Sequence, residues 1–298
     1  YGVCNFAYPL ILEKGSFASS EALTAAEGLE PYFVIDMPPL FGVMSALILS
    51  FVLGLALASV KGNAFRTVLN EFREVIMLVI RKVIIPLLPL YIFGIFLKMG
   101  VEGTVMMIIG LFLKVIIVIF ILHVVLLLLQ FCIAGGVAGK NPLKCLKNML
   151  PAYMTALGTQ SSAATIPVTL AQAKKNGVRA EVADFVIPLC GTIHLSGSTL
   201  KIVACAFAIS FMTGMPSGIG LYTEFIFMLG IAMVAAPGVP GGAIMASIGI
   251  IGSILGFDED MQGLMIALYI AMDSFGTACN VTGDGAIALI VDRIFRKA

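Results

Sequence analysis

A stripe of polar side chains inside an apolar run constrains the fold of this chain more than any other feature. Within the run from Leu264 to Val291, four polar residues follow one another at spacings of four, three and four: Asp273, Thr277, Asn280 and Asp284. On an α-helix this spacing puts all four side chains on one face. At about 1.5 Å per residue the run is long enough to cross a bilayer. Carboxylates at that depth are costly unless they meet a cation, a partner or water, so the stripe indicates a substrate or ion path.

The composition places the chain in a membrane. Hydrophobic residues make up 60% of it and charged residues 12%, whereas a soluble domain has about 25% charged residues. The net charge of +1 gives no electrostatic footprint for a nucleic acid. The cysteines form no C-x-x-C pair and have no H-x-x-x-H nearby, so we expect no zinc site and no disulfide framework. We interpret them as small apolar packing residues: Cys4, Cys132, Cys145, Cys190, Cys205 and Cys279.

Apolar runs precede the polar half of the chain. They cover about Phe41 to Val60, Val75 to Leu97, and Val105 to Val137. The last run is longer than one perpendicular span needs, so we expect it to be tilted or to protrude. Residues 1–36 are expected to form a polar segment. Because the chain starts at Tyr1 and not at Met, we also expect its natural N-terminus to be missing.

Two interrupted segments predict helical hairpins that enter the membrane and turn back. The first spans about residues 145–175 with a polar centre from Gly158 to Pro167, and the second spans about 222–257 with Pro237 to Gly242 at its tip. The arms beside the first tip are too short to cross alone. Non-helical backbone at membrane depth is tolerated only where protein or a watery cavity satisfies it. Re-entrant hairpins therefore fit better than spans.

The distribution of charge supports this topology. If both hairpins are re-entrant, the basic stretches at 140–147, 174–179 and 293–297 lie on one side of the membrane, and acidic residues 258–260 lie on the other. By the positive-inside rule the basic side is cytoplasmic.

Between the hairpins lies a broken helix, at about residues 180–214. It is interrupted from Gly191 to Ser198, where glycine and small hydroxyl residues let the helix unwind and turn carbonyls toward a cation. The final helix, at about residues 261–294, carries the polar stripe. Hairpin, broken helix, hairpin and polar helix form a weak internal repeat. Paired interruptions of this kind point to the binding site of a transporter.

Four motifs in this order resemble the dicarboxylate/amino-acid:cation symporters, a family that includes glutamate transporters and bacterial serine/threonine transporters. The resemblance covers the chain from about Pro38 onward. The motifs are Gln160-Ser161-Ser162 with Thr165-Ile166-Pro167-Val168-Thr169, the break from Gly191 to Ser198, Gly238-Val239-Pro240-Gly241, and Asn280-Val281-Thr282-Gly283-Asp284.

The resemblance implies an all-α polytopic membrane protein with a glutamate-transporter-like fold. Residues 37–103 would be scaffold transmembrane helices, and residues 104–298 a transport domain with two re-entrant helical hairpins, a broken helix and a polar final helix. It also implies a homotrimer in a bacterial inner membrane, with roughly the first quarter of the protein missing from this chain.

The family's site residues carry over by position. Asp273 would bind the α-ammonium of the substrate and Asn280 its α-carboxylate, with Thr277 lining the pocket. The remaining substrate-binding positions are Ser161, Ser162, Ser198 and Val239, and the gate comprises Pro237, Gly238, Pro240 and Gly241. One sodium site would use Asp284, Asn280 and groups at Cys190 and His194, and another would use Thr192 and the second tip. Oxygen ligands suit a hard cation.

Two departures from the family pattern bear on the substrate and the ion. Acidic-substrate members hold the second carboxylate with an arginine, but the matching region here is Ser274-Phe275-Gly276, and the alternative arginine position holds Gln160. Without a bidentate guanidinium, a small neutral amino acid such as serine, threonine or alanine is expected. In the broken helix, Ser196 stands where sodium-coupled glutamate transporters have a carboxylate. We therefore expect fewer sodium ions per cycle.

Two basic residues of the broken helix have open roles. His194 is expected either to hold the unwound backbone as a neutral imidazole or to take up a proton. Lys201 lies one turn beyond the break. Its ammonium is expected to fill a vacated cation site, to snorkel, or to form a buried pair.

The predicted function is secondary active symport by alternating access, coupled to Na⁺ or alternatively to H⁺, with no other cofactor. The partners expected are an amino acid, the lipid bilayer and further copies of the chain, but no nucleic acid. Ser161 and Ser162 have no neighbouring His and Asp in the sequence that would make a serine nucleophile, so no enzyme is predicted. His123 is expected to be a packing or interface residue. The alternatives are a dicarboxylate transporter of the same fold and a channel-like conductor of solutes or anions.

Overall fold

The computed structural model describes residues 1–16, 43–79, 105–236 and 240–297, with isolated residues between 82 and 100. Its secondary structure in these ranges is helical, which confirms the expected all-α class. The helices are α1 (Gly2–Ile11), α2 (Val43–Ser59), α3 (Ala64–Val79), α5 (Val105–Ala138), α6 (Pro142–Asn148), α7 (Leu150–Thr159), α8 (Ser162–Lys175), α9 (Ala180–Ile193), α10 (Ser196–Thr213), α11 (Ile219–Ala235), α12 (Gly242–Leu255), α13 (Glu259–Ala271) and α14 (Asp273–Lys297).

Local sequence signals account for several of these boundaries. The Asn141 side chain accepts a hydrogen bond from the Lys144 N–H, 3.0 Å away, and Pro142 occupies the first turn of α6. Asp258 caps α13 in the same way through the Met261 N–H at 2.9 Å. At its other end, α10 stops at a glycine in the left-handed region, Gly214, with φ of 72°.

Two helical segments of the described part are long and apolar enough to cross a bilayer. They are Ile109–Ala138 in α5 and Ala180–Thr213 across α9 and α10, and the bent pair α13–α14 makes a third if it counts as one span. In the apolar 18-residue stretch of α5 only 28% is buried, whereas in the corresponding stretch of α9–α10 78% is buried. The broken helix is therefore central to the fold, while α5 has an apolar outer face.

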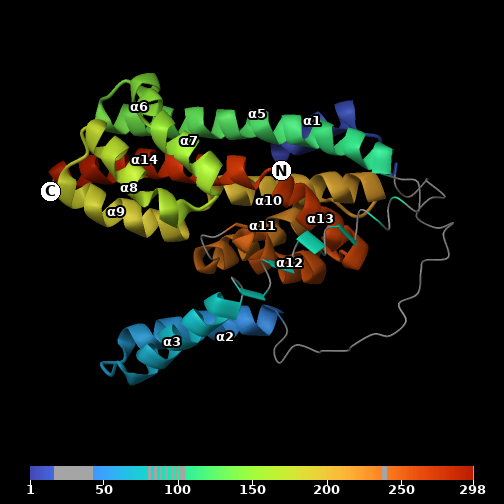
Figure 1. Ribbon diagram of the computed structural model, residues 1–298, viewed down its shortest axis with the longest axis horizontal. Helices are drawn as coiled ribbons and strands as arrows, with labels where there is room; N and C mark the ends of the chain where they lie inside the picture. Colours follow the sequence, from blue (N-terminus) through green and yellow to red (C-terminus); the bar gives the residue numbers. More distant parts are fainter. Residues whose placement is uncertain are drawn as a thin grey trace.

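The helices enclose two apolar cores. One contains residues of α1, α10, α11, α12, α13 and the first half of α5, including Phe207, Tyr222 and Tyr269. The other contains residues of α6 to α9, α14 and the end of α5, including Phe131 and Met149. Figure 1 shows α5 lying along α14, with α11 and α12 on the opposite side of α10. The seam between the cores lies where α10 meets α14.

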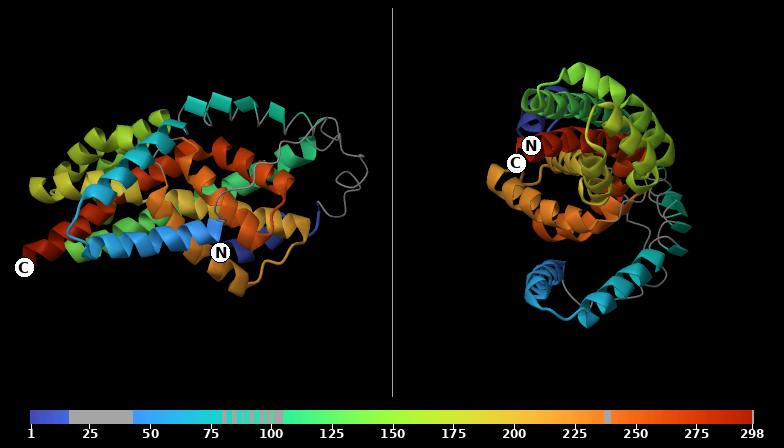
Figure 2. Two further views of the ribbon diagram at one scale, coloured as in Figure 1. Left: turned by 90° about the horizontal axis from the view of Figure 1, so that it is seen from below. Right: turned by 90° about the vertical axis from the view of Figure 1, so that its left-hand side faces the viewer.

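Helices α2 and α3 lie to one side of this body (Figure 2), and residues of α2 contact α12. Their apolar side chains are largely exposed, among them Phe51, Val52 and Phe72. Most residues of the expected scaffold beyond α3, up to residue 104, lie outside the described part.

The interrupted segments form two antiparallel helix pairs. Helices α7 and α8 meet at Gln160, which adopts the left-handed conformation with φ of 51°, and at Ser161, whose hydroxyl caps α8 through the Ala164 N–H. Helices α11 and α12 meet at residues 236–241, of which 237–239 lie outside the described part. Gly241 there has φ of 70°, a conformation that favours glycine.

The structure adds detail at both ends of the chain. The expected N-terminal segment, residues 1–36, begins with a packed helix: α1 buries Cys4, Tyr8 and the following Leu12 against α10. The Tyr8 hydroxyl donates to the carbonyl of Ala204 at 3.2 Å. The single final helix expected at about 261–294 is instead two helices, α13 and α14, bent by 61° at Met272. Asp273 begins α14, and its carboxylate is held by groups from other helices.

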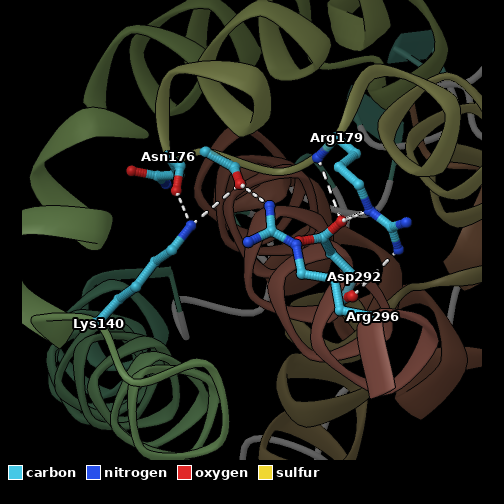
Figure 3. A network of polar contacts seen from close by, with 6 residues as sticks. Lys140, Asn176, Arg179, Asp292 and Arg296 are labelled. Carbon is cyan, nitrogen blue, oxygen red and sulfur yellow. Dashed lines mark hydrogen bonds and ion pairs between the residues drawn. The ribbon is translucent and has the colours of Figure 1, made fainter. Parts of the chain in front are cut away.

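Basic segments that are distant in sequence meet at one end of the body (Figure 3). Asp292 of α14 accepts hydrogen bonds from the Arg179 backbone N–H at 3.2 Å and from its Nε at 2.8 Å, and pairs with Arg296 at 3.0 Å. Lys140, beyond α5, donates to the carbonyls of Asn176 and Gly177. The loop after α5, the turn before α9 and the end of α14 are thus joined on the side predicted to be cytoplasmic.

Candidate binding site

All four residues of the polar stripe are buried on α14. The exposed fractions are 4% for Asp273, 6% for Thr277, 1% for Asn280 and 2% for Asp284. Asp273 and Asn280 of the stripe contact α10, and Asp284 contacts the end of α9. Since buried charges and amides need partners, the groups that bind them define the chemistry of the site.

Asp273 is bound by groups from two other elements. Its Oδ1 lies 3.1 Å from Nζ of Lys201 on α10, and its Oδ2 accepts a hydrogen bond of 2.7 Å from the Gly241 N–H at the second tip. Lys201 is fully buried, donates to the Tyr269 carbonyl at 3.2 Å, and lies 3.3 Å from the centroid of the Tyr269 ring. The ammonium therefore does not snorkel. It forms a buried pair with the carboxylate that the sequence assigned to the substrate.

Asn280 binds the start of α10. Its Oδ1 accepts hydrogen bonds from the N–H groups of Gly197 at 2.7 Å and Ser198 at 3.2 Å, and its Nδ2 donates to the Ser198 hydroxyl at 3.0 Å. The first N–H groups of a helix have no partner within the helix, so an amide oxygen from α14 caps the restarted helix. A side chain at Gly197 has no room, since a Cβ there would lie 2.7 Å from the Gly276 carbonyl oxygen.

Asp284 is paired with the end of α9. Nδ1 of His194, the C-cap residue of α9, lies 2.7 Å from Oδ1 of Asp284. Gly283 permits this approach, because a Cβ there would lie 2.8 Å from the His194 ring and 2.8 Å from Oε1 of Gln130. The His194 N–H donates to the Cys190 carbonyl at 2.8 Å. The structure thus brings together three residues of one predicted sodium site, Cys190, His194 and Asp284.

The side chain of Thr192 is not part of this group. Its side chain is exposed, and its hydroxyl donates to the carbonyl of Leu189 on its own helix at 2.7 Å. Among the residues of the second tip that the structure describes, Pro240 and Gly241, neither is bound by the Thr192 hydroxyl.

The first tip packs on the helix break. Ser162 is buried, and a Cβ at Gly191 would lie 3.1 Å from the Ile166 side chain and 3.9 Å from the Ser162 carbonyl oxygen. Ser161 is partly buried and serves as the cap of α8. At the second tip, Gly241 binds Asp273 and Pro240 is partly buried, whereas the predicted positions Pro237, Gly238 and Val239 lie outside the described residues.

Three residues at the break were not assigned to the site from the sequence. His123 of α5 is buried, as a packing residue would be, and its Nε2 lies 3.0 Å from the Gly197 carbonyl oxygen. Gln130 donates to the Ser196 hydroxyl at 3.2 Å, and Tyr269 lies under Lys201. The signal for the first two was their spacing: they are polar residues seven positions apart, two helical turns, in an otherwise apolar helix.

The arrangement suits binding of charged solutes. In the described ranges no three His, Cys, Asp or Glu side chains converge as a metal cluster, so a cation here would rely on oxygen donors. Such donors are present: the Asp284 carboxylate, the last carbonyls of α9, and Oε1 of Gln130, which is buried without a hydrogen-bond partner in the described part. Ser161 is the N-cap of α8, where its hydroxyl accepts a hydrogen bond from the Ala164 N–H.

Comparison with known proteins supports the motif-based resemblance. The model of the sodium:dicarboxylate symporter family matches residues 2–294. Excitatory amino acid transporter 1 from Bos taurus is 30% identical over 262 residues, which are 85% of this chain and 47% of that protein. Excitatory amino acid transporter 3 from Mus musculus is 33% identical over 175 residues, 58% of this chain and 32% of the relative. The chain spans less than half the length of either relative.

Proposed function

The chain belongs to the sodium:dicarboxylate symporter family, and on that premise we propose that it carries a small neutral amino acid across a membrane together with Na⁺. It is a membrane protein and a transporter by family, not an enzyme. The proposal adds the substrate class, the ion and the mechanism of alternating access. It also places the protein in a bacterial cell membrane as a homotrimer.

One observation carries this proposal. The buried stripe of α14 faces the break between α9 and α10, and a carboxylate of the stripe binds each side of that break: Asp284 binds His194 and Asp273 binds Lys201. Charged groups buried in a membrane protein mark solute and ion paths. Two carboxylates on the same face of α14, beside an unwound helix, allow a solute and a cation to bind next to each other.

The substrate end of the site lies at Asp273. A carboxylate facing an α-ammonium offsets the cost of removing both charges from water. On the same helix, residues 274–276 provide no guanidinium for a second carboxylate, and Phe275 packs edge to face on Phe120 with centroids 5.6 Å apart. These features favour serine, threonine or alanine over glutamate or aspartate.

The ion end lies at Asp284. We assign Na⁺ as a co-substrate bound by the Asp284 carboxylate, the carbonyls that end α9 and the amide oxygen of Gln130. The carbonyl of Thr192 belongs to this set by its position at the end of α9, and its hydroxyl does not. The Asn280 oxygen already accepts two N–H groups, so its role is to hold α10 in place beside the ion.

The second tip acts as the gate. Gly241 binds the same carboxylate that binds the substrate, so the position of the tip depends on the occupancy of Asp273. Ion and substrate share the broken helix, and binding of one orders the helix for the other. The loaded body, residues 104–298, then moves across the scaffold helices to expose the site on the other side.

Uptake into vesicles containing the reconstituted protein tests the proposal. Labelled L-serine and L-aspartate are supplied in parallel under a sodium gradient, a proton gradient or no gradient. The proposal requires saturable serine uptake driven by sodium and exchange of internal for external serine. Uptake of aspartate alone contradicts the substrate assignment, proton-driven uptake without sodium contradicts the ion, and unsaturable flux without a gradient indicates a channel.

A further inference from the structure

The carboxylate proposed to bind the substrate already carries a cation of the protein itself. Lys201 is fully buried, and Asp273 is 4% exposed. The ammonium has three contacts: Asp273 Oδ1 at 3.1 Å, the Tyr269 carbonyl at 3.2 Å and the face of the Tyr269 ring at 3.3 Å. A solute that binds Asp273 must therefore separate this pair or become part of it.

A solute that brought only an ammonium would leave Lys201 without its anion. Removing one partner of a buried ion pair is strongly destabilising, because the other charge stays uncompensated. The Tyr269 carbonyl and ring cannot replace the carboxylate, since they carry no net charge. The solute must therefore supply an anionic group of its own to the Lys201 ammonium.

We propose that Lys201 is a substrate-binding residue whose ammonium receives the carboxylate of a zwitterionic amino acid while Asp273 receives its ammonium. The inference rests on the proposed function and deepens it by naming the charge pattern of the substrate. The solute opens one internal pair and replaces it by two pairs. The sum of the charges in the site stays zero before and after binding.

Lys201 and Ser198 both lie close against the backbone of Gly276. A Cβ at this position would lie 3.1 Å from Nζ of Lys201 and 3.6 Å from the Ser198 hydroxyl oxygen, so a carboxylate that reaches these two donors must displace the ammonium from its present position. Asn280, which the family pattern assigns to the α-carboxylate, has its oxygen bound to Gly197 and Ser198. Lys201 is thus a cationic donor that lies beside both Asp273 and the Ser198 hydroxyl, at the backbone of Gly276.

The charge balance sets the specificity. A neutral amino acid adds no net charge to a buried site that holds one lysine and one aspartate. Aspartate adds one negative charge, and a simple amine adds one positive charge, each without a compensating group. The site therefore selects the zwitterion over either of its halves and over an acidic amino acid.

Truncated ligands measure this directly. The probes are L-serine, ethanolamine, which is serine without its carboxylate, 3-hydroxypropanoate, which is serine without its ammonium, and L-aspartate. Dissociation constants are determined by titration calorimetry on the purified protein and on Lys201→Met, with Lys144→Met, an exposed lysine, as the matched control. A charge-assisted hydrogen bond changes affinity by roughly 10- to 100-fold.

The wild type is expected to bind serine at least about 10-fold more tightly than ethanolamine, 3-hydroxypropanoate or aspartate. In Lys201→Met the preference for serine over ethanolamine should disappear, because the carboxylate has lost its partner. Lys144→Met should keep it. An unchanged serine-to-ethanolamine ratio in Lys201→Met overturns the inference while serine binding by the wild type still supports the proposed function.

If Lys201→Met does not fold, Asp273→Asn gives the complementary measurement. It leaves Lys201 in place, so 3-hydroxypropanoate should bind at least as tightly as serine does to that variant. No gain for 3-hydroxypropanoate relative to serine overturns the inference. A wild type that binds no neutral amino acid overturns the proposed function itself, and one that binds aspartate in preference to serine overturns both.

Discussion

Nδ1 of His194 lies 2.7 Å from Oδ1 of Asp284, although the two residues are 90 positions apart in the chain. The contact joins the end of α9 to the last residue of the polar stripe. A cation that binds Asp284 therefore meets an imidazole already on the carboxylate, and the two share its oxygens.

Asp284→Asn should weaken the dependence of uptake on the cation. The amide keeps the size of the side chain and loses its charge, so the cation concentration for half-maximal uptake should rise roughly 10-fold or more. Uptake of labelled serine over a range of sodium concentrations measures the effect. Asp184→Asn is the control, since Asp184 is an exposed residue paired with Lys174. Equal sodium curves for Asp284→Asn and the wild type would remove Asp284 from the ion site.

Gly283→Ala should disturb the same site by steric contact alone. The new Cβ would lie 2.8 Å from the His194 ring and 2.8 Å from Oε1 of Gln130, so His194 must move away from Asp284. We expect a loss of about 1–3 kcal/mol of stability and a shift of the sodium curve. Gly230→Ala on α11, where a Cβ meets nothing within 4 Å, is the matched control. Thermal unfolding in detergent measures the loss of stability, and uptake measures the shift of the sodium curve. If Gly283→Ala and Gly230→Ala give the same results in both measurements, the packing argument is contradicted.

Gly241→Ala tests the gate. With φ of 70°, an alanine here costs about 1–2 kcal/mol and shifts the N–H that binds Asp273. Substrate affinity should fall, because the second tip no longer closes on the carboxylate. Calorimetric titration with serine gives the readout, and Gly220→Ala, with open space around it, is the control. The gate assignment fails if the two variants bind serine equally well.

Asp292→Asn tests the joined end of the body. Its side chain is 5% exposed and pairs with Arg179 and Arg296, whose side chains are 37% and 45% exposed. Partial exposure of the arginines weakens the pairs, so we expect Asp292→Asn to lower the free energy of unfolding by about 1–3 kcal/mol. Asp184→Asn, which breaks an exposed pair, should lower it by less than about 1 kcal/mol. Unfolding curves at low and high salt compare the two variants. Equal losses would show that this cluster contributes no more than a surface ion pair.

Patterns within one segment were predictable from the sequence. The spacing of Asp273 and Asp284 fixes them on one helical face, and the glycine-rich stretch after Cys190 marks the interrupted helix. These are local properties of a helix of 3.6 residues per turn, and the structure has both the face and the break.

Partnerships between segments were not predictable. Lys201 and Asp273 are 72 positions apart, and their contact depends on how α10 is rotated and shifted against α14. No spacing rule in either helix sets that register, so the buried pair remained one of three alternatives. The bend at Met272 and the packing of α1 on α10 depend in the same way on neighbours distant in sequence.

The junction at His194 and Leu195 fixes how α10 is rotated relative to α9. Each residue of an α-helix turns it by about 100°, so one inserted or deleted residue in this junction would rotate the face of α10 away from α14. Ser198 and Lys201 would lose Asn280 and Asp273 together, while His194 stayed on Asp284. The length of this short segment is therefore under tighter constraint than its composition. The insertion or deletion of a single residue would uncouple the solute end of the site from the ion end.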